Sequence, residues 1–281
     1  MRIRVGELSF DAQSCGEPGA PLVLMLHGFP QTSHTWRHQL EPLAAAGYHA
    51  VAPNQRGYSA DARPTNLDAY ATERLVADAL DMMESLGHQR AHIVGHDWGG
   101  QLSWLLAAHH PDRVESLTVL SRPHPQAFLA AMRDDPAQSE RSKHHRAFQD
   151  PDSARRLLEN DAGRLRRSFT DQGVDRADQD AYLHALGEEA ALDAAINWYR
   201  APVRAGSDQP LAPKNTPSVS VPTLYVWGDA DSTVGRAAAE GTAAFVTGPY
   251  RFEVLPGVGH FVTDQAGERV TELLLEHLRG A

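Results

Sequence analysis

The segment that most restricts the fold of this chain is a glycine-rich turn around residue 97. Ile93 and Val94 lead into a Gly-x-Asp-x-Gly turn over residues 95–99, and residues 101–108 have a composition typical of a helix. The pattern predicts a strand, a sharp turn and a helix, which is the setting of a nucleophile elbow. Glycine suits such a turn because a side chain would clash with the neighbouring strand or helix. The residue expected at the apex is an aspartate, Asp97, and not a serine.

Apolar runs alternate with helical patterns on both sides of this turn. Leu22–Leu26 is a continuous apolar run of the kind found in strands that are buried on both faces. The alternation predicts an α/β fold with a mostly parallel sheet, flanked by helices and connected by right-handed crossovers. Besides the elbow, the expected strands are 2–5, 9–12, 22–26, 49–52, 114–120, 223–227 and 250–255, and the expected helices are 36–46, 70–86, 235–246 and 264–279.

Residues 123–216 interrupt this alternation of predicted strands and helices. The segment is rich in Arg, Asp, Ala and Gln with helical spacing, contains no convincing strand, and ends in a proline-punctuated linker over residues 210–217. We therefore predict a core built from residues 1–122 and 217–281, with an all-helical cap at 123–216 inserted between its two parts.

Composition excludes several classes of protein. A net charge of -10 argues against a nucleic-acid partner, and no run approaches the ~20 apolar residues that a membrane span needs. The start of the chain has no apolar signal-peptide core, and a single cysteine, Cys15, fits a reducing compartment, so we expect a cytoplasmic protein. The fifteen histidines do not follow zinc-ligand spacings, so no metal is expected. The sequence leaves open whether the protein forms a homo-oligomer.

Polar residues follow three further predicted strands. His27–Pro30 follows strand 22–26, Asp229 and Asp231 follow strand 223–227, and His260 follows strand 250–255. The carboxyl ends of parallel strands are where α/β sheets build their sites. The order of nucleophile, acid and histidine is that of α/β-hydrolases.

Four motifs in this order resemble the α/β-hydrolase superfamily, in the branch of epoxide hydrolases and haloalkane or haloacetate dehalogenases. The motifs are His27–Pro30, Gly95–Gly100, Asn197–Arg200 and Gly257–His260. The resemblance implies Asp97 as the nucleophile, His260 as the general base and Asp231, favoured over Asp229 by its spacing from Gly228, as the residue that orients His260. It also implies an oxyanion hole made by the backbone N–H groups of Phe29 and Trp98.

An aspartate nucleophile suits attack on a saturated carbon. A carboxylate is already anionic at neutral pH and needs no base to activate it. The product would be an ester of Asp97, which a water activated by His260 would then hydrolyse. The expected reactants are a small-molecule epoxide and water, with no cofactor.

The resemblance also implies donors in the cap. Asn197–Arg200 resembles the motif that carries a tyrosine donating to the ring oxygen of an epoxide, so Tyr199 is the expected donor. Counting back from the sequence Phe-Gln-x-Pro at 148–151 gives His144 as the second donor, with His145 as a competitor. Pro30 and Trp198 are expected in the substrate pocket, and Trp36 either lines that pocket or packs the first helix.

Two alternatives to epoxide opening remain. Haloacetate dehalogenases carry arginines where this chain has Trp98 and Gln101, so their clamp for a substrate carboxylate is missing. Haloalkane dehalogenases use an indole N–H at the Trp98 position, which fits, but Phe29 lacks the amide that many of them have there. Epoxide hydrolysis is therefore the leading hypothesis, a dehalogenase is the second, and a non-catalytic binding relative is the third.

Overall fold

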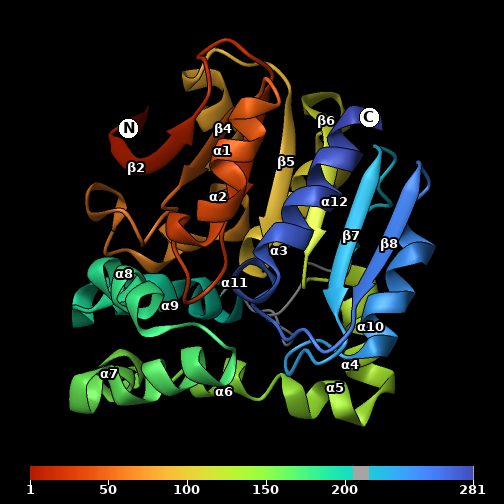
Figure 1. The fold of residues 1–281 in the computed structure, drawn as a ribbon. Helices are drawn as coiled ribbons and strands as arrows, with labels where there is room; N and C mark the ends of the chain where they lie inside the picture. Colours follow the sequence, from red (N-terminus) through yellow and green to blue (C-terminus); the bar gives the residue numbers. More distant parts are fainter. Residues whose placement is uncertain (205–214, 281) are drawn as a thin grey trace.

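The computed structural model describes residues 1–204 and 215–280, and an eight-stranded sheet runs through it (Figure 1). The strand order is β1-β2-β4-β3-β5-β6-β7-β8; β2 is antiparallel to both of its neighbours, and the other pairs are parallel. The strands are β1 (Arg2–Val5), β2 (Leu8–Cys15), β3 (Leu22–Leu26), β4 (His49–Pro53), β5 (Ala91–His96), β6 (Val114–Leu120), β7 (Thr223–Gly228) and β8 (Tyr250–Leu255). The predicted α/β-hydrolase fold class is thus confirmed.

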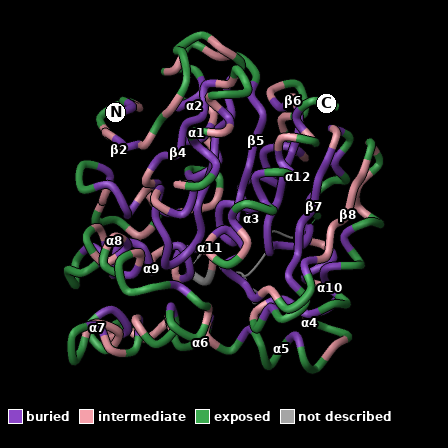
Figure 2. Tube along the Cα trace, viewed as in Figure 1, coloured by how far each residue is buried: buried purple, intermediate pink, exposed green. Residues whose placement is uncertain are grey.

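Helices cover both faces of the sheet, and Figure 2 shows its central strands buried. On one face α1 (Arg37–Ala45) and α12 (Gly267–Gly280) pack leucines against apolar side chains of β3 and β5. On the other face α2 (Thr72–Ser85) and α3 (Trp98–His109) do the same. Burial on both faces is why the central strands have continuous apolar runs and show no alternation.

The described part of the segment between β6 and β7 consists of helices joined by short loops, with an isolated bridge between Val219 and Val246 near its end. Its helices are α4 (Pro125–Asp134), α5 (Pro136–Arg141), α6 (His144–Ala147), α7 (Ser153–Asp171, interrupted at 159–162), α8 (Arg176–Leu186) and α9 (Glu189–Arg204). Figure 1 shows α5–α9 stacked across the end of the sheet to which the parallel strands point. We call α5–α9 the cap.

The first helix of the insertion, α4, packs with α10 (Arg236–Gly241) and the short helix η5 (Thr242–Phe245) beside β7 and β8. The boundary of the cap at residue 123 therefore remains a proposal, and this packing favours a start close to α5. The proposed exit linker at 210–217 lies largely outside the described residues.

Two predicted helices are divided in the structure. The segment 235–246 forms α10 and then the tighter η5. The segment 264–279 forms α11 (Val262–Gln265) and α12, because Ala266 leaves the helical angles with φ -137° and ψ 37°. The helix predicted from residue 36 begins as a 3-10 turn, η1 (Ser33–Trp36). Propensity alone does not resolve such breaks, since tertiary contacts set them. Within the described residues, no helix combines the length and the apolar character needed to span a bilayer.

Candidate active site

The turn after β5 holds Asp97 in a backbone conformation that L-residues rarely adopt, with φ 50°. The turn closes so tightly that a Cβ on Gly95 would lie 2.2 Å from Oγ of Ser103, and one on Gly99 would lie 2.0 Å from the carbonyl oxygen of Leu26. Both glycines are therefore required by close approach. A strained non-glycine residue of this kind persists only where the surrounding structure enforces it, and such residues cluster at functional sites.

One carboxylate oxygen of Asp97 is held by the loop that follows β3. The backbone N–H of Phe29 donates to Oδ1 at 3.0 Å. Trp98 is the first residue of α3, so its N–H has no acceptor within the helix. The two N–H groups expected to form an oxyanion hole thus flank Asp97, and Oδ2 remains for other contacts.

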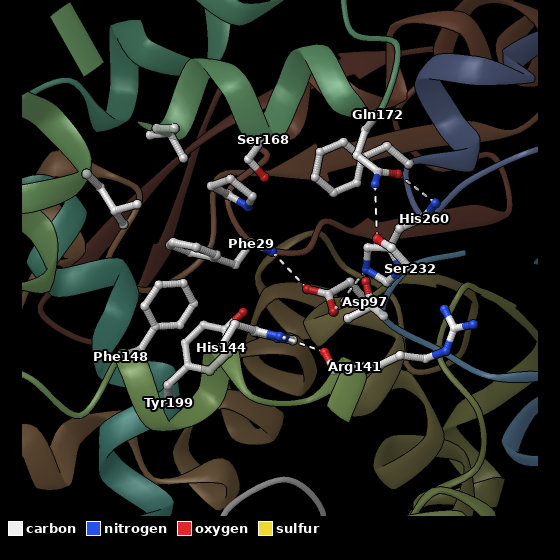
Figure 3. Close-up of a pocket in the computed structure, with 15 residues that line it drawn as sticks. Phe29, Asp97, Arg141, His144, Phe148, Ser168, Gln172, Tyr199, Ser232 and His260 are labelled. Carbon is white, nitrogen blue, oxygen red and sulfur yellow. Dashed lines mark hydrogen bonds and ion pairs between the residues drawn. The ribbon is translucent and has the colours of Figure 1, made fainter. Parts of the chain in front are cut away.

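His260 lies between two carboxylates, of which Figure 3 shows Asp97. Its Nδ1 is 2.8 Å from Oδ2 of Asp231, and its Nε2 is 3.5 Å from Oδ2 of Asp97. The other oxygen of Asp231 accepts the backbone N–H groups of Thr233 and Val234 at 2.7 and 2.9 Å. The competing acid, Asp229, accepts the N–H of Gly257 instead and does not contact His260.

Burial and mutual attraction set the charges of this triad. Burial would raise the pKa of Asp97, but the hydrogen bond and charge of His260 outweigh it and hold that pKa well below its usual range. Burial would lower the pKa of His260, yet Asp231 and Asp97 together raise it to about 10. Asp97 is therefore a carboxylate at neutral pH, and His260 is protonated while Asp97 carries its charge.

The pKa values of two neighbouring histidines are shifted in the opposite direction from that of His260. Burial lowers the pKa of His27 and of His96 to about 4, so both are neutral near pH 7. His96 Nε2 lies 2.8 Å from the carbonyl oxygen of His260 and fixes the main chain of that residue. Burial without a carboxylate partner accounts for the difference from His260.

Tyr199, from α9, closes the site from the cap side. Its ring packs against those of Phe29, Trp98 and Phe148, with centroids 5.4, 5.0 and 4.7 Å away. Burial, with the charge of Asp97 adding to it, raises the pKa of Tyr199 well above its ordinary value, while a hydrogen bond with Trp98 opposes the rise. The phenol therefore keeps its proton and can donate it.

Of the two candidate histidines in the cap, only His144 lines the cavity that contains Asp97. His145 is 5 % exposed and packs against Trp98 and Tyr199. His144 Nδ1 is 3.1 Å from the carbonyl oxygen of Arg141. Because a carbonyl only accepts, Nδ1 carries the proton in that bond, and burial lowers the pKa of His144.

The cavity above Asp97 has a volume of about 250 Å3. The following residues line it: Phe29, Pro30, Asp97, Arg141, His144, Phe148, Leu157, Leu165, Ser168, Gln172, Tyr199, Ser232, Thr233, His260 and Phe261. Its cap side is largely apolar, and its charged groups lie at the strand ends and at the rim. Pro30 lines the cavity, as the sequence analysis expects.

Two predicted pocket residues lie elsewhere. Trp36 is fully buried among Val23, Met25 and Leu40 under the sheet, so it packs the core. Trp198 is turned away from the cavity, and its indole N–H donates to the carbonyl oxygen of Arg56 at 2.8 Å. Consecutive residues of a helix point about 100° apart, so Tyr199 faces the cavity while the indole of Trp198 points toward Arg56.

Most of the cap residues that line the cavity were not predicted from the sequence. Leu157, Leu165, Ser168 and Gln172 all come from α7 or its end, and no local motif marks them. Helical spacing could group Leu157, Leu165 and Ser168 on related faces, but it cannot identify what that face covers.

The fold and the triad define an α/β-hydrolase. Residues 21–266 match the family model described as alpha/beta hydrolase fold, so the chain belongs to that family. Epoxide hydrolase A of Mycobacterium tuberculosis is 33% identical, over 100% of this chain and 95% of the relative, and mouse epoxide hydrolase 4 is 32% identical, over 99% and 79%. The crystal structure of epoxide hydrolase A from Mycobacterium thermoresistibile superposes with a TM-score of 0.84 at 29% identity, covering 100% of this chain and 98% of that one. The predicted membership of the epoxide hydrolase-like branch is confirmed.

Proposed function

We propose that this protein hydrolyses an epoxide to a vicinal diol through a covalent ester of Asp97. The observation that carries the proposal is the orientation of the Asp97 carboxylate. Oδ1 is held by the Phe29 N–H, while Oδ2 is 3.5 Å from His260 Nε2 in a cavity that Tyr199 lines from the opposite side. The similarity to epoxide hydrolases named above agrees with this reading.

The first step is attack by Oδ2 on a ring carbon. The Oδ2–C bond forms while the C–O bond of the ring breaks, and the electron pair of that bond goes to the ring oxygen. Tyr199 donates its proton to this developing alkoxide, which is the role its raised pKa permits. Asp97 needs no base for this step because it is already ionised.

Formation of the ester changes His260. Asp97 and Asp231 both raise the pKa of His260, and esterification removes the charge of Asp97. The pKa of His260 then falls, the imidazolium releases a proton to solvent, and this release balances the proton that Tyr199 regains. His260 becomes a base only after the first step is complete.

The second step is hydrolysis of the ester. Water adds to Cγ of Asp97 while His260 Nε2 takes a proton from it, and the negative charge develops on Oδ1, to which the Phe29 N–H donates. The Cγ–Oδ2 bond then breaks, Oδ2 leaves with the diol, and His260 returns the proton to it. The oxygen of water thereby becomes part of the Asp97 carboxyl group, whose remaining proton passes to His260 and restores the carboxylate and the imidazolium.

The same geometry favours epoxide opening over haloalkane dehalogenation. The phenol of Tyr199 lines the cavity that contains Asp97, and its pKa is raised, so it can donate a proton to a ring oxygen, which a departing halide ion does not require.

The test is to trap the ester. A His260→Gln variant incubated with styrene oxide should gain the mass of one substrate on the peptide that contains Asp97, because ring opening continues and hydrolysis stops. The double variant Asp97→Ala, His260→Gln should gain nothing. If His260→Gln shows no adduct with aromatic, aliphatic or terminal epoxides, the proposed function is wrong.

A further inference from the structure

A glutamine of the cap is bonded to the loops that carry His260 and Asp231. Gln172 follows the last residue of α7 and lines the cavity. Its Oε1 accepts the backbone N–H of His260 at 2.8 Å, and its Nε2 donates to Oγ of Ser232 at 3.2 Å. Figure 3 shows this amide between His260 and Ser232. One neutral side chain thus connects the histidine to the residue that follows the acid.

The main chain of Gln172 is held in turn by the core. Its carbonyl oxygen accepts from Nε2 of Gln265 at 2.5 Å, and Oε1 of Gln265 accepts the N–H of Gly259 at 2.7 Å. The side chain of Gln172 packs closely against the histidine loop, because a Cβ on Gly259 would lie 2.7 Å from Oε1 of Gln172. Hydrogen bonds therefore connect the end of α7 directly to the loop that carries His260.

A second glutamine holds the loop of the acid. Gln138, in α5, is fully buried, donates from Nε2 to the carbonyl oxygen of Thr233 at 2.9 Å, and accepts the N–H of Gly235 on Oε1 at 2.8 Å. Arg141 donates to the carbonyl oxygen of Asp231 itself at 2.6 Å. Hydrogen bonds from the cap thus hold the loop at 231–235, and the amide of Gln172 connects this loop to the backbone of His260.

We infer that Gln172 is a positioning residue for hydrolysis of the ester and has no part in ring opening. The inference rests on the proposed function, since it concerns the second step of that scheme. Ring opening uses Asp97, Phe29 and Tyr199, none of which bonds to Gln172. Hydrolysis depends on the direction of the His260 imidazole, which Asp231 sets and Gln172 supports through the backbone. An amide orients this pair without adding a charge that would shift the pKa of His260.

The experiment compares Gln172→Leu with Gln179→Leu. Gln179 is a buried cap glutamine whose amide nitrogen donates to Thr170 and Val174, both within the cap, so it controls for general disturbance of the helices. For Gln172→Leu with styrene oxide we expect kcat to fall about 10-fold, KM to fall with it, and kcat/KM to stay unchanged, because the loss of one well-aligned hydrogen bond affects only the second step. The ester should accumulate at steady state in the intact-mass spectrum. Gln179→Leu should show no more ester than the wild type.

Parallel losses of kcat and kcat/KM in Gln172→Leu, or no rise in the ester, would overturn the inference. The His260→Gln variant is run alongside. An ester in His260→Gln without one in Gln172→Leu rejects only the role of Gln172, whereas no ester in either rejects the proposed function.

A second variant tests the same role if Gln172→Leu does not fold. Gln172→Glu keeps an oxygen that can accept the N–H of His260 but brings a negative charge to it. That charge should raise the pKa of His260 and move the pH profile of kcat to higher pH, while kcat/KM stays as in the wild type. A matching change in kcat/KM would contradict the inference, because it would place Gln172 in ring opening as well.

Discussion

The core side and the cap side of the cavity use different chemistry. The core presents the charged groups Asp97, Asp231 and His260, which lie one, three and five residues after the ends of β5, β7 and β8. The cap presents mainly neutral groups, chiefly Tyr199 and His144 among apolar side chains, and adds the charge of Arg141 from α5. The covalent chemistry therefore belongs to the core, and the cap stabilises the leaving oxygen and surrounds the substrate.

The two connections between cap and core show the same contrast. At α8, Asp178 pairs with Arg37, which in turn pairs with the buried Asp264 at 2.8 Å. Nearer to the triad, the side chains that bond the acid and histidine loops include the amides of Gln138 and Gln172. The ion pairs stabilise the contact between cap and core away from the reacting atoms. The uncharged amides orient the loops beside the triad without shifting the pKa of His260.

The largest expected effect is on the core side. Asp97→Ala removes the nucleophile, and turnover of an epoxide should fall by about 10⁴-fold or more, as for removal of other nucleophiles. Asp229→Ala is the control, since Asp229 also follows a parallel strand of the sheet, β7, but its side chain accepts the N–H of Gly257. Diol formation measured for both variants checks this. Comparable losses in the two variants would mean that the strand end matters only as a scaffold.

A smaller effect is expected on the cap side. Tyr199→Phe keeps the ring packing and removes the donor, so kcat/KM should fall about 10²–10³-fold. Tyr182→Phe is the control, because Tyr182 is equally buried in the cap but donates to Asp264 at 2.9 Å. Steady-state kinetics with one epoxide distinguish them. A silent Tyr199→Phe variant would remove the phenol from the proposed mechanism.

The pH dependence of ring opening separates the two cap donors. Neutral His144 carries its proton on Nδ1 toward Arg141, so Nε2 can donate only in the imidazolium form. Burial lowers the pKa of His144, so this form appears only below the ordinary value of about 6.5. Asp97 stays ionised there because its pKa is held low. We expect kcat/KM to rise by up to about 10-fold as the pH falls toward 5.

This rise should disappear in His144→Gln and persist in His145→Gln, whose histidine does not line the cavity. The pH profiles of kcat/KM for the three proteins are the measurement. A falling profile in the wild type would exclude His144 as a donor.

The smallest effect on activity is expected at the charged connection. Asp178→Asn weakens the pair with Arg37 and the contact with His34 Nε2 at 2.6 Å. Both partners of the ion pair are about one-fifth exposed, so the loss should be about 1 kcal/mol, or about 2–4 °C in Tm. Asp180→Asn, which disturbs pairs with Arg166 and Arg176 inside the cap, should change Tm less.

Thermal unfolding and kcat/KM, measured on the same samples, test the comparison between the two connections. Asp178→Asn should keep kcat/KM within about 2-fold of the wild type while Tm falls. A large loss of activity would show that the charged connection also positions the site.

The sequence predicted the core side better than the cap side. Asp97, His260 and Phe29 lie in short motifs at strand ends, where a few neighbouring residues define the geometry. Trp36 packs the core, which is the second of its two expected places, and Trp198 lies outside the lining of the cavity, because the direction of a side chain depends on the elements packed around it. Gln172 has no motif at all, since its importance arises from residues 60 and 88 positions away along the chain.

The amino-acid sequence alone determined the strand–turn–helix at residue 97, the aspartate at its apex, and the order of acid and histidine that follows. These depend on local backbone requirements and on the regular connection of parallel strands. The sequence favoured Asp231 over Asp229 and His144 over His145, but only the tertiary structure places Asp231 against His260 and His144 in the cavity lining, and it alone reveals the cap glutamines that hold both loops. The physical reason is range: a hydrogen bond needs its two atoms within about 3 Å, and only the folded chain sets such distances between residues remote in sequence.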